Sequence, residues 1–148
     1  MNKYQKKLVF ALRITIGWLF LYAGITKVLN PDWSAAGYLN NAQSFTGFYQ
    51  WLASDNMIAI TNFANAWGLT IIGFLLLVGL FVRWASIAGA VVMMLYYFPI
   101  LNFPKVGDHS YIVDEHIIYA VVLLLLGALK AGEYWGSEDW GRKLLKRR

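Results

Sequence analysis

The stretch LVFALRITIGWLFLYAGITKVL, residues 8–29, is apolar over a length that can cross a lipid bilayer. It contains two charged residues, Arg13 and Lys27. A helix of about 20 such residues spans about 30 Å of hydrocarbon. Three further apolar runs follow, at residues 58–82, 84–103 and 111–129. The four runs predict a single all-α domain over the whole chain, an integral membrane bundle of four helices.

The overall composition agrees with a membrane protein. Of the 148 residues, 59% are hydrophobic and only 14% are charged, whereas soluble domains carry about 25% charged residues. Cysteine is absent, which excludes thiol nucleophiles and iron–sulfur ligation by this chain. The two histidines lie too far apart in sequence to suggest a metal site. Redox chemistry would therefore need a bound organic cofactor or a partner's metal.

The charged residues divide between alternate connections of the four runs. The cations precede the first run, separate the second from the third, and follow the fourth: Lys3, Lys6, Lys7, Arg83, Lys130, Arg142, Lys143, Lys146, Arg147 and Arg148. Acids gather in the other connections and at the start of the fourth run: Asp32, Asp55, Asp108, Asp114 and Glu115. By the positive-inside rule the bundle is antiparallel, with both termini cytoplasmic. The net charge of +5 then indicates attachment to anionic lipid rather than to nucleic acid.

The first outer connection, residues 30–57, is rich in aromatic residues. Its aromatic side chains are Trp33, Tyr38, Phe45, Phe48, Tyr49 and Trp51. We expect one or two short interfacial helices here, serving either as an aromatic belt at the membrane surface or as a lid over the bundle. The tail from residue 133 onward has the pattern of an amphipathic interfacial end.

Helical periodicity indicates which side chains point into the bundle. In the first run Arg13, Gly17, Phe20, Gly24 and Lys27 follow one another at steps of four and three, so they share one face. Small residues on such a face let helices approach closely. An equivalent face of the second run is formed by Asn65, Gly68, Ile72, Leu76, Gly79 and Arg83.

Depth along the helices brings polar groups of all four runs to one level. With the first and third runs directed outward, the outer half contains Lys27, Asn62, Asn65, Tyr96, Tyr97, Glu115, His116 and Tyr119. Ionisable groups inside a membrane are costly and suggest a functional site. Lys27 is the expected counter-ion of Glu115 or Asp114, and His116 faces the small-residue side of its helix.

Each of these residues also has a structural interpretation. Asp114 stands where it can cap the fourth helix, and Asn65 can hydrogen-bond between helices. Arg13 can reach the cytoplasmic head groups. The whole outer cluster can be a buried polar network that fixes the register of the helices.

Two segments resemble the DoxX family of four-helix membrane proteins: RITIGWLFLYAGITKV at 13–28 and GFLLLVGLFVRWASIAGAVVMM at 73–94. The segment WSAAGYL at 33–39 and the DEH at 114–116 are most similar to the DoxD-like branch. A glutamate common in the family's second span is missing here, where Leu69 and Thr70 stand. The resemblance implies the membrane subunit of a thiosulfate:quinone oxidoreductase, in the cytoplasmic membrane of a prokaryote, acting with a second redox subunit.

The function expected from the outer cluster is the binding of a quinone by a redox subunit. Reduction of a quinone adds protons as well as electrons, so a site needs an apolar slot, hydrogen-bond donors and a titratable group. Catalytic roles fall to His116, Glu115 and Lys27, with His116 donating to a quinone oxygen, Glu115 orienting it or relaying protons, and Lys27 attracting an oxyanion or a charged form of the quinone. The expected cofactor-binding residues are Tyr96, Tyr97, Tyr119, Asn65 and Arg13.

Two other functions fit the same residues. One is a non-catalytic membrane anchor or assembly subunit, in which the cluster only fixes helix register. The other is a pathway for protons or small solutes. Assembly into a homo-oligomer is compatible with all three.

Overall fold

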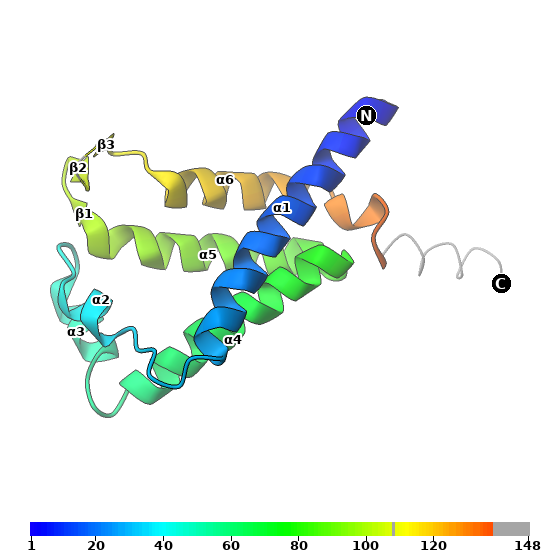
Figure 1. Cartoon of the computed structure of the whole chain (residues 1–148). Coiled ribbons are helices and arrows are strands. Elements are labelled where there is room, and N and C mark those ends of the chain that lie inside the picture. The colour runs from blue at the N-terminus through cyan, green and yellow to red at the C-terminus, as the bar shows by residue number, and fades with distance from the viewer. Residues whose placement is uncertain (108, 138–148) are drawn as a thin grey trace.

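The structure is a computed structural model that describes residues 1–107 and 109–137 (Figure 1). The long helices are α1 (Lys3–Val28), α4 (Ile58–Val78), α5 (Val82–Ile100) and α6 (Glu115–Ala128). The short elements are α2 (Ala36–Asn40), α3 (Thr46–Leu52), β1 (Leu101–Asn102), β2 (Lys105–Val106), β3 (Ser110–Tyr111) and the 3₁₀ helix η1 (Ala131–Glu133). Helices α2 and α3 and the strands lie at one end of the long helices, the loop end (Figure 1). The N-terminus, the α4–α5 turn and η1 lie at the other, the basic end.

The short turn between α4 and α5 is bounded on both sides by backbone signals. Helix α4 stops at Gly79, whose φ of +73° belongs to the left-handed region that favours glycine. Helix α5 starts after Phe81. The chain therefore turns at residues 79–81, and Arg83 belongs to the first turn of α5.

The helices pack as two pairs, α1 against α4 and α5 against α6, with less extensive contact between α4 and α5 (Figure 1). Glycines let α1 and α4 meet backbone to backbone. A Cβ on Gly73 would lie 2.6 Å from Leu21 Cα, and one on Gly24 would lie 2.8 Å from Thr70 Cα. Gly17 is also at this crossing, so the inward face predicted for the first run is confirmed. On α4 the contact is made by Gly73, because Gly68 has open space beside it.

Helix α6 is shorter than the predicted fourth span of 111–129. It has 14 residues, or about 21 Å, because two local structures occupy the residues before it. Ser110–Tyr111 pair with β2 in a three-stranded antiparallel sheet, and Asp114 caps the helix by accepting hydrogen bonds from the amides of His116 and Ile117. The cap predicted at Asp114 is confirmed, whereas the sheet was not predicted.

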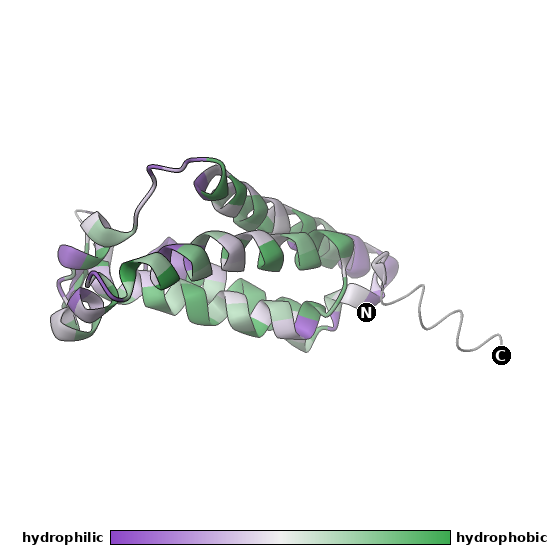
Figure 2. Cartoon of the chain, turned by 90° about the horizontal axis from the view of Figure 1, so that it is seen from below, coloured by the Kyte–Doolittle hydropathy of each residue, from purple (hydrophilic) through white to green (hydrophobic). Residues whose placement is uncertain are grey.

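The helices α1, α4 and α5 are each long and apolar enough to cross a membrane. Large apolar side chains on their outer faces, including Trp18, Phe63 and Phe74, are more than half exposed. Figure 2 shows hydrophobic residues along the lengths of the helices and hydrophilic residues toward their ends. A surface of this kind is stable against lipid and not against water, as expected for a membrane protein.

The short helices predicted in the first outer connection are confirmed as α2 and α3. The buried residues Ala35, Leu39 and Tyr49 form a second small core there, which packs against Phe98 of α5. Phe45, Phe48 and Trp51 remain exposed on the outside. The segment thus covers the end of α5 and also presents an aromatic outer surface. The predicted amphipathic tail lies mostly outside the described residues, as do Asp108 and the cations from Arg142 to Arg148.

A proline inside α5 explains why this segment docks where it does. Pro99 has no N–H, so the carbonyl of Leu95 loses its helical donor. The Tyr49 hydroxyl supplies the missing donor, at 3.0 Å from Leu95 O. Tyr49 is only 2% exposed, so water does not compete for this bond.

Replacement of Tyr49 by phenylalanine is expected to lower the free energy of unfolding by about 1–3 kcal/mol, the cost of leaving a buried carbonyl unsatisfied. The measurement is thermal or denaturant unfolding of the purified protein in detergent. Tyr111→Phe is the matched control, because Tyr111 is exposed. Equal stability of the two variants would contradict this account of the docking.

Candidate functional site

Three residues from three helices meet at the loop end. The Lys27 ammonium of α1 donates to Asn65 Oδ1 of α4 at 3.0 Å and to the Tyr96 hydroxyl of α5 at 2.9 Å. The Tyr96 hydroxyl in turn donates to Asn65 Oδ1 at 2.7 Å. The steps of three and four that placed Lys27 and Asn65 on inward faces, together with the depth that placed Tyr96 at the same level, therefore predicted this cluster.

The charge of Lys27 is balanced without a carboxylate. Its Nζ lies 4.9 Å from the ring centroid of Trp33 and 5.2 Å from that of Tyr96, distances that allow cation–π attraction. Within residues 1–107 and 109–137, no ion pair to Lys27 is formed. The prediction that Lys27 pairs with Glu115 or Asp114 is wrong, because Asp114 is engaged by its own helix and Glu115 is exposed.

The carboxylate of Asp114 holds His116 instead. Asp114 Oδ2 lies 2.6 Å from His116 Nδ1, while Oδ1 caps the helix amides. With Nδ1 occupied, Nε2 is the ring nitrogen left for another group. The His116 ring meets the Tyr96 ring edge to face, with 6.0 Å between centroids. Asp114, and not Glu115, is therefore the carboxylate that orients the His116 ring.

A cavity of about 300 Å³ opens beside these groups. We call it the Lys27 site; it is lined by Lys27, Trp33, Tyr38, Asn65, Tyr96 and His116, with Ser34, Ala35 and Ile100. A second cavity of about 270 Å³ adjoins it and shares Ala35, Tyr38, Asn65 and Tyr96. Apart from Thr61 and these shared residues, its lining is almost entirely apolar, with residues such as Leu39, Leu52, Ile60 and Val92.

Tyr38 lines both cavities, and a hydrogen bond fixes the position of its side chain. Its hydroxyl donates to the carbonyl of Tyr96 at 2.5 Å. Burial raises the pKa of Tyr38 to about 12, and the nearby tyrosines and Asp114 add to this effect. The phenol therefore keeps its proton at neutral pH and remains a donor.

Asn62 fixes the segment that carries Trp33 and Tyr38. Its Oδ1 accepts from the Ala35 amide at 2.9 Å, and its amide nitrogen donates to Ser34 Oγ at 3.2 Å. The sequence placed Asn62 at the level of the outer polar cluster. Its spacing of three from Asn65, which places both on one helix face, is the signal that links it to this site.

Four of the residues predicted for the site lie elsewhere. The Tyr97 hydroxyl is buried and donates to the Ile112 carbonyl. Tyr119 packs against the helix core, and Glu115 is exposed. None of these three lines either cavity at the loop end.

The fourth, Arg13, lies at the basic end and is fully buried. Its Nη1 donates to the Ala131 carbonyl at 2.8 Å, and its Nη2 lies 3.5 Å from the Trp135 carbonyl. It therefore joins α1 to the chain after α6. The prediction that Arg13 reaches the cytoplasmic head groups is wrong, because its side chain is fully buried and donates to a backbone carbonyl inside the protein.

The profile of the DoxX family matches residues 8–100 of the chain. The chain belongs to the DoxX family. Neither the search of curated proteins nor that of solved structures found a significant match. The part that matches the DoxX profile extends from α1 to the end of α5 and includes Lys27, Asn65 and Tyr96, while Asp114 and His116 follow it. Family membership and the three long apolar helices together make this a DoxX membrane protein.

Proposed function

We propose that this DoxX protein is a membrane redox subunit that binds a quinone in the Lys27 site. In this proposal electrons come from thiosulfate or another sulfur oxyanion through a second redox subunit, as in the DoxD-like branch that the sequence resembles. The distribution of cations supports an orientation with both termini in the cytoplasm of a prokaryote. The Lys27 site then faces the outer leaflet, and α1, α4, α5 and α6 form an antiparallel four-helix bundle.

The observation that carries the proposal is a lysine ammonium that lines a cavity and has no carboxylate partner among the residues that the structure describes. Two of its three N–H donors are used by Asn65 and Tyr96, which leaves one for a ligand. An ammonium in this setting favours an acceptor oxygen, and most strongly one that gains negative charge. Ionisable groups at membrane depth are retained chiefly where they serve a function.

The shape of the two adjoining cavities suits a ligand with a planar polar head and an apolar chain. The Lys27 site is walled by the aromatic rings of Trp33, Tyr38 and Tyr96. The adjoining apolar cavity starts at the same residues. The volume of the Lys27 site is at the low end of the 300–1,000 Å³ range of ligand pockets, and that of the adjoining cavity is slightly below it, so we expect the ring to be enclosed and the chain to extend into lipid.

A bound quinone would supply the capacity to take up two electrons and two protons. The residues of the chain would hold and orient its oxygens: Lys27 by a charge-assisted hydrogen bond and His116 through Nε2. With Nδ1 held by the Asp114 carboxylate, Nε2 is the nitrogen that would meet the quinone: it would donate to a quinone oxygen when it carries a proton and accept from the hydroxyl of the reduced form when it does not. The aromatic walls and the α2–α3 segment would exclude water from the ring.

A second candidate is supported by the same hydrogen bonds. Lys27, Asn65 and Tyr96 bond to one another across three helices, as a network that only fixes helix register would do. In that case the protein would be a non-catalytic anchor for a partner, and the cavity would have no ligand of its own.

Quinone content and quinone binding test the proposal. We expect quinone in organic extracts of the protein purified from its own membranes, and a rise of the melting temperature with a short-chain quinone analogue. His116→Ala should weaken the analogue about 2- to 12-fold, the equivalent of one hydrogen bond. Glu115→Ala is the matched control, because its side chain lies outside the cavity. Absence of quinone from the extract together with no thermal shift would contradict the proposal.

A further inference from the structure

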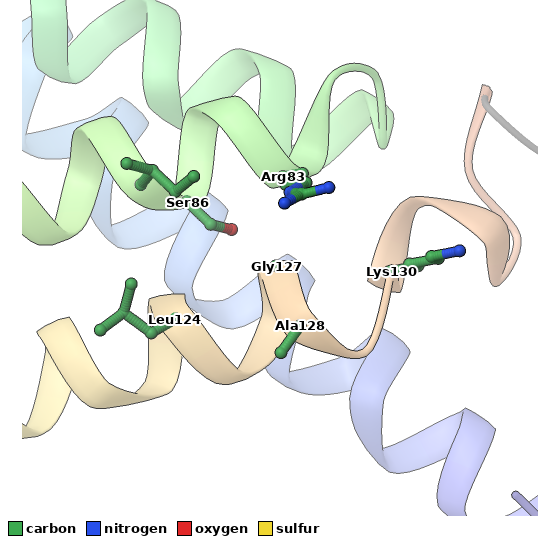
Figure 3. Close-up of a pocket in the computed structure, with 7 residues that line it drawn as sticks. Arg83, Ser86, Leu124, Gly127, Ala128 and Lys130 are labelled. Atoms are coloured by element: carbon green, nitrogen blue, oxygen red, sulfur yellow. The ribbon is translucent and has the colours of Figure 1, made fainter.

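A separate cavity of about 370 Å³ lies between α5 and α6 at the basic end. Figure 3 shows it with Arg83 and Ser86 on α5, Gly127 on α6 and Lys130 just after α6. It takes no part in the Lys27 site, which is at the opposite end of the same helices.

The Ser86 hydroxyl is a buried polar group without a partner. Ser86 is 0% exposed, and no group of the described residues hydrogen-bonds to its Oγ. Serines within helices usually donate to the carbonyl four residues earlier, and buried hydroxyls without a partner are rare. In Figure 3 the hydroxyl points from α5 into the gap above Gly127. A Cβ on Gly127 would lie 3.3 Å from Ser86 Cβ, so a larger residue there would crowd the gap.

The mouth of this cavity is positive. Among the described residues that line it, the charged ones are Arg83 and Lys130, and both are exposed. No acid lines it. Two cations and a buried hydroxyl donor are groups that recognise a phosphate oxyanion, and no carboxylate of the described residues stands beside them to repel it.

An apolar groove continues from the cavity along the same two helices. Ile87 and Leu124 line both the cavity and this groove, whose volume is about 490 Å³. All residues of the groove are apolar, among them Val91, Met94, Phe98 and Val121. From Ile87 to Phe98 it extends about 16 Å along α5, close to the half-thickness of a bilayer's hydrocarbon, about 15 Å.

We propose that this surface is a binding site for an anionic phospholipid. The phosphate of the head group is held by Arg83, Ser86 and Lys130, and one acyl chain lies in the groove between α5 and α6. A phospholipid has an anionic head group followed by apolar chains. The surface has the matching arrangement, because the cavity with the two cations continues into the apolar groove. Basic pockets between membrane helices are known to favour such lipids. The site is independent of the quinone proposal.

Native mass spectrometry of the whole protein in detergent tests this site with phosphatidylglycerol and phosphatidylcholine of identical chains. We expect tighter binding of phosphatidylglycerol, and a loss of roughly 25-fold in the double variant Arg83→Gln/Lys130→Gln, because each cation near the surface contributes about fivefold. Lys7→Gln, which removes an exposed cation at the same end, should keep the preference. Equal phosphatidylglycerol binding by the double variant and the parent protein would overturn the proposal.

Two further experiments test whether an acyl chain occupies the groove and whether the phosphate belongs to a lipid. Val121→Trp fills the groove and should weaken both lipids, whereas Ile118→Trp, on the exposed face of α6 outside the groove, should not. Inorganic phosphate should neither stabilise the protein nor compete with the lipid. Competition by phosphate would assign the site to a free anion, and a dimer that dissociates on Val121→Trp would assign the groove to a second copy. Either result would overturn the lipid site.

Discussion

Replacement of Lys27 by methionine is expected to weaken a quinone analogue by roughly 10- to 150-fold without destabilising the protein. The loss corresponds to one charge-assisted hydrogen bond, about 1.5–3 kcal/mol. Stability should be equal or higher, because methionine keeps much of the apolar stem and removes a partly buried cation that no carboxylate of the described residues balances. The measurements are analogue titration and thermal unfolding of the same preparation.

The two measurements on Lys27→Met separate the leading functions. If Lys27 only fixes helix register, the variant should unfold at a lower temperature and bind the analogue as the parent protein does. Lys105→Met is the matched control, because Lys105 is an exposed lysine at the same end of the molecule and lines neither cavity there. It should leave both quantities unchanged.

Replacement of Gly73 by isoleucine should have the largest effect on stability, a loss of about 3 kcal/mol or more, as for severe overpacking. A Cβ at this position would lie 2.6 Å from Leu21 Cα and 2.8 Å from Gly17 O. These are backbone atoms, so no change of rotamer relieves the clash, and α1 would have to move away from α4. Because α1 carries Lys27 and α4 carries Asn65, quinone-analogue binding should fall as well.

Gly68→Ile provides the control for the effect of Gly73→Ile. Gly68 is on the same helix, but a Cβ there has no neighbour within 4 Å. Both substitutions carry the same change in helix propensity, so their difference isolates the crossing of α1 and α4. Equal unfolding temperatures for the two variants would contradict the close crossing.

The sequence was sufficient to predict the three longest helices and the convergence of four polar residues at one end of them. Apolar length indicated α1, α4 and α5, and the period of 3.6 placed Lys27, Asn65, Tyr96 and His116 on inward faces. The direction of successive helices then brought them to one level. These predictions succeeded because each depends on a regular helix, in which position along the chain determines both depth and face.

Other features depend on contacts that helical periodicity does not encode. Tyr96 and Tyr97 differ by about 100° around the helix, and only the positions of neighbouring segments decide that Tyr96 faces the cavity while Tyr97 bonds to the Ile112 carbonyl. Arg13 is buried because its acceptors come from residues more than 100 positions away. The strands of the small sheet have two residues each, too few to show an alternating pattern.

The most direct test of the quinone site is photolabelling with a quinone that carries a photoreactive group on its ring, followed by mapping of the modified residues by mass spectrometry. The account predicts adducts on residues of the Lys27 site, in particular Trp33, Tyr38 and Tyr96, that disappear when unlabelled quinone is added and are reduced in Lys27→Met. Adducts confined to other surfaces, such as Val91 and Val121 of the α5–α6 groove, or labelling that unlabelled quinone does not reduce, would contradict it.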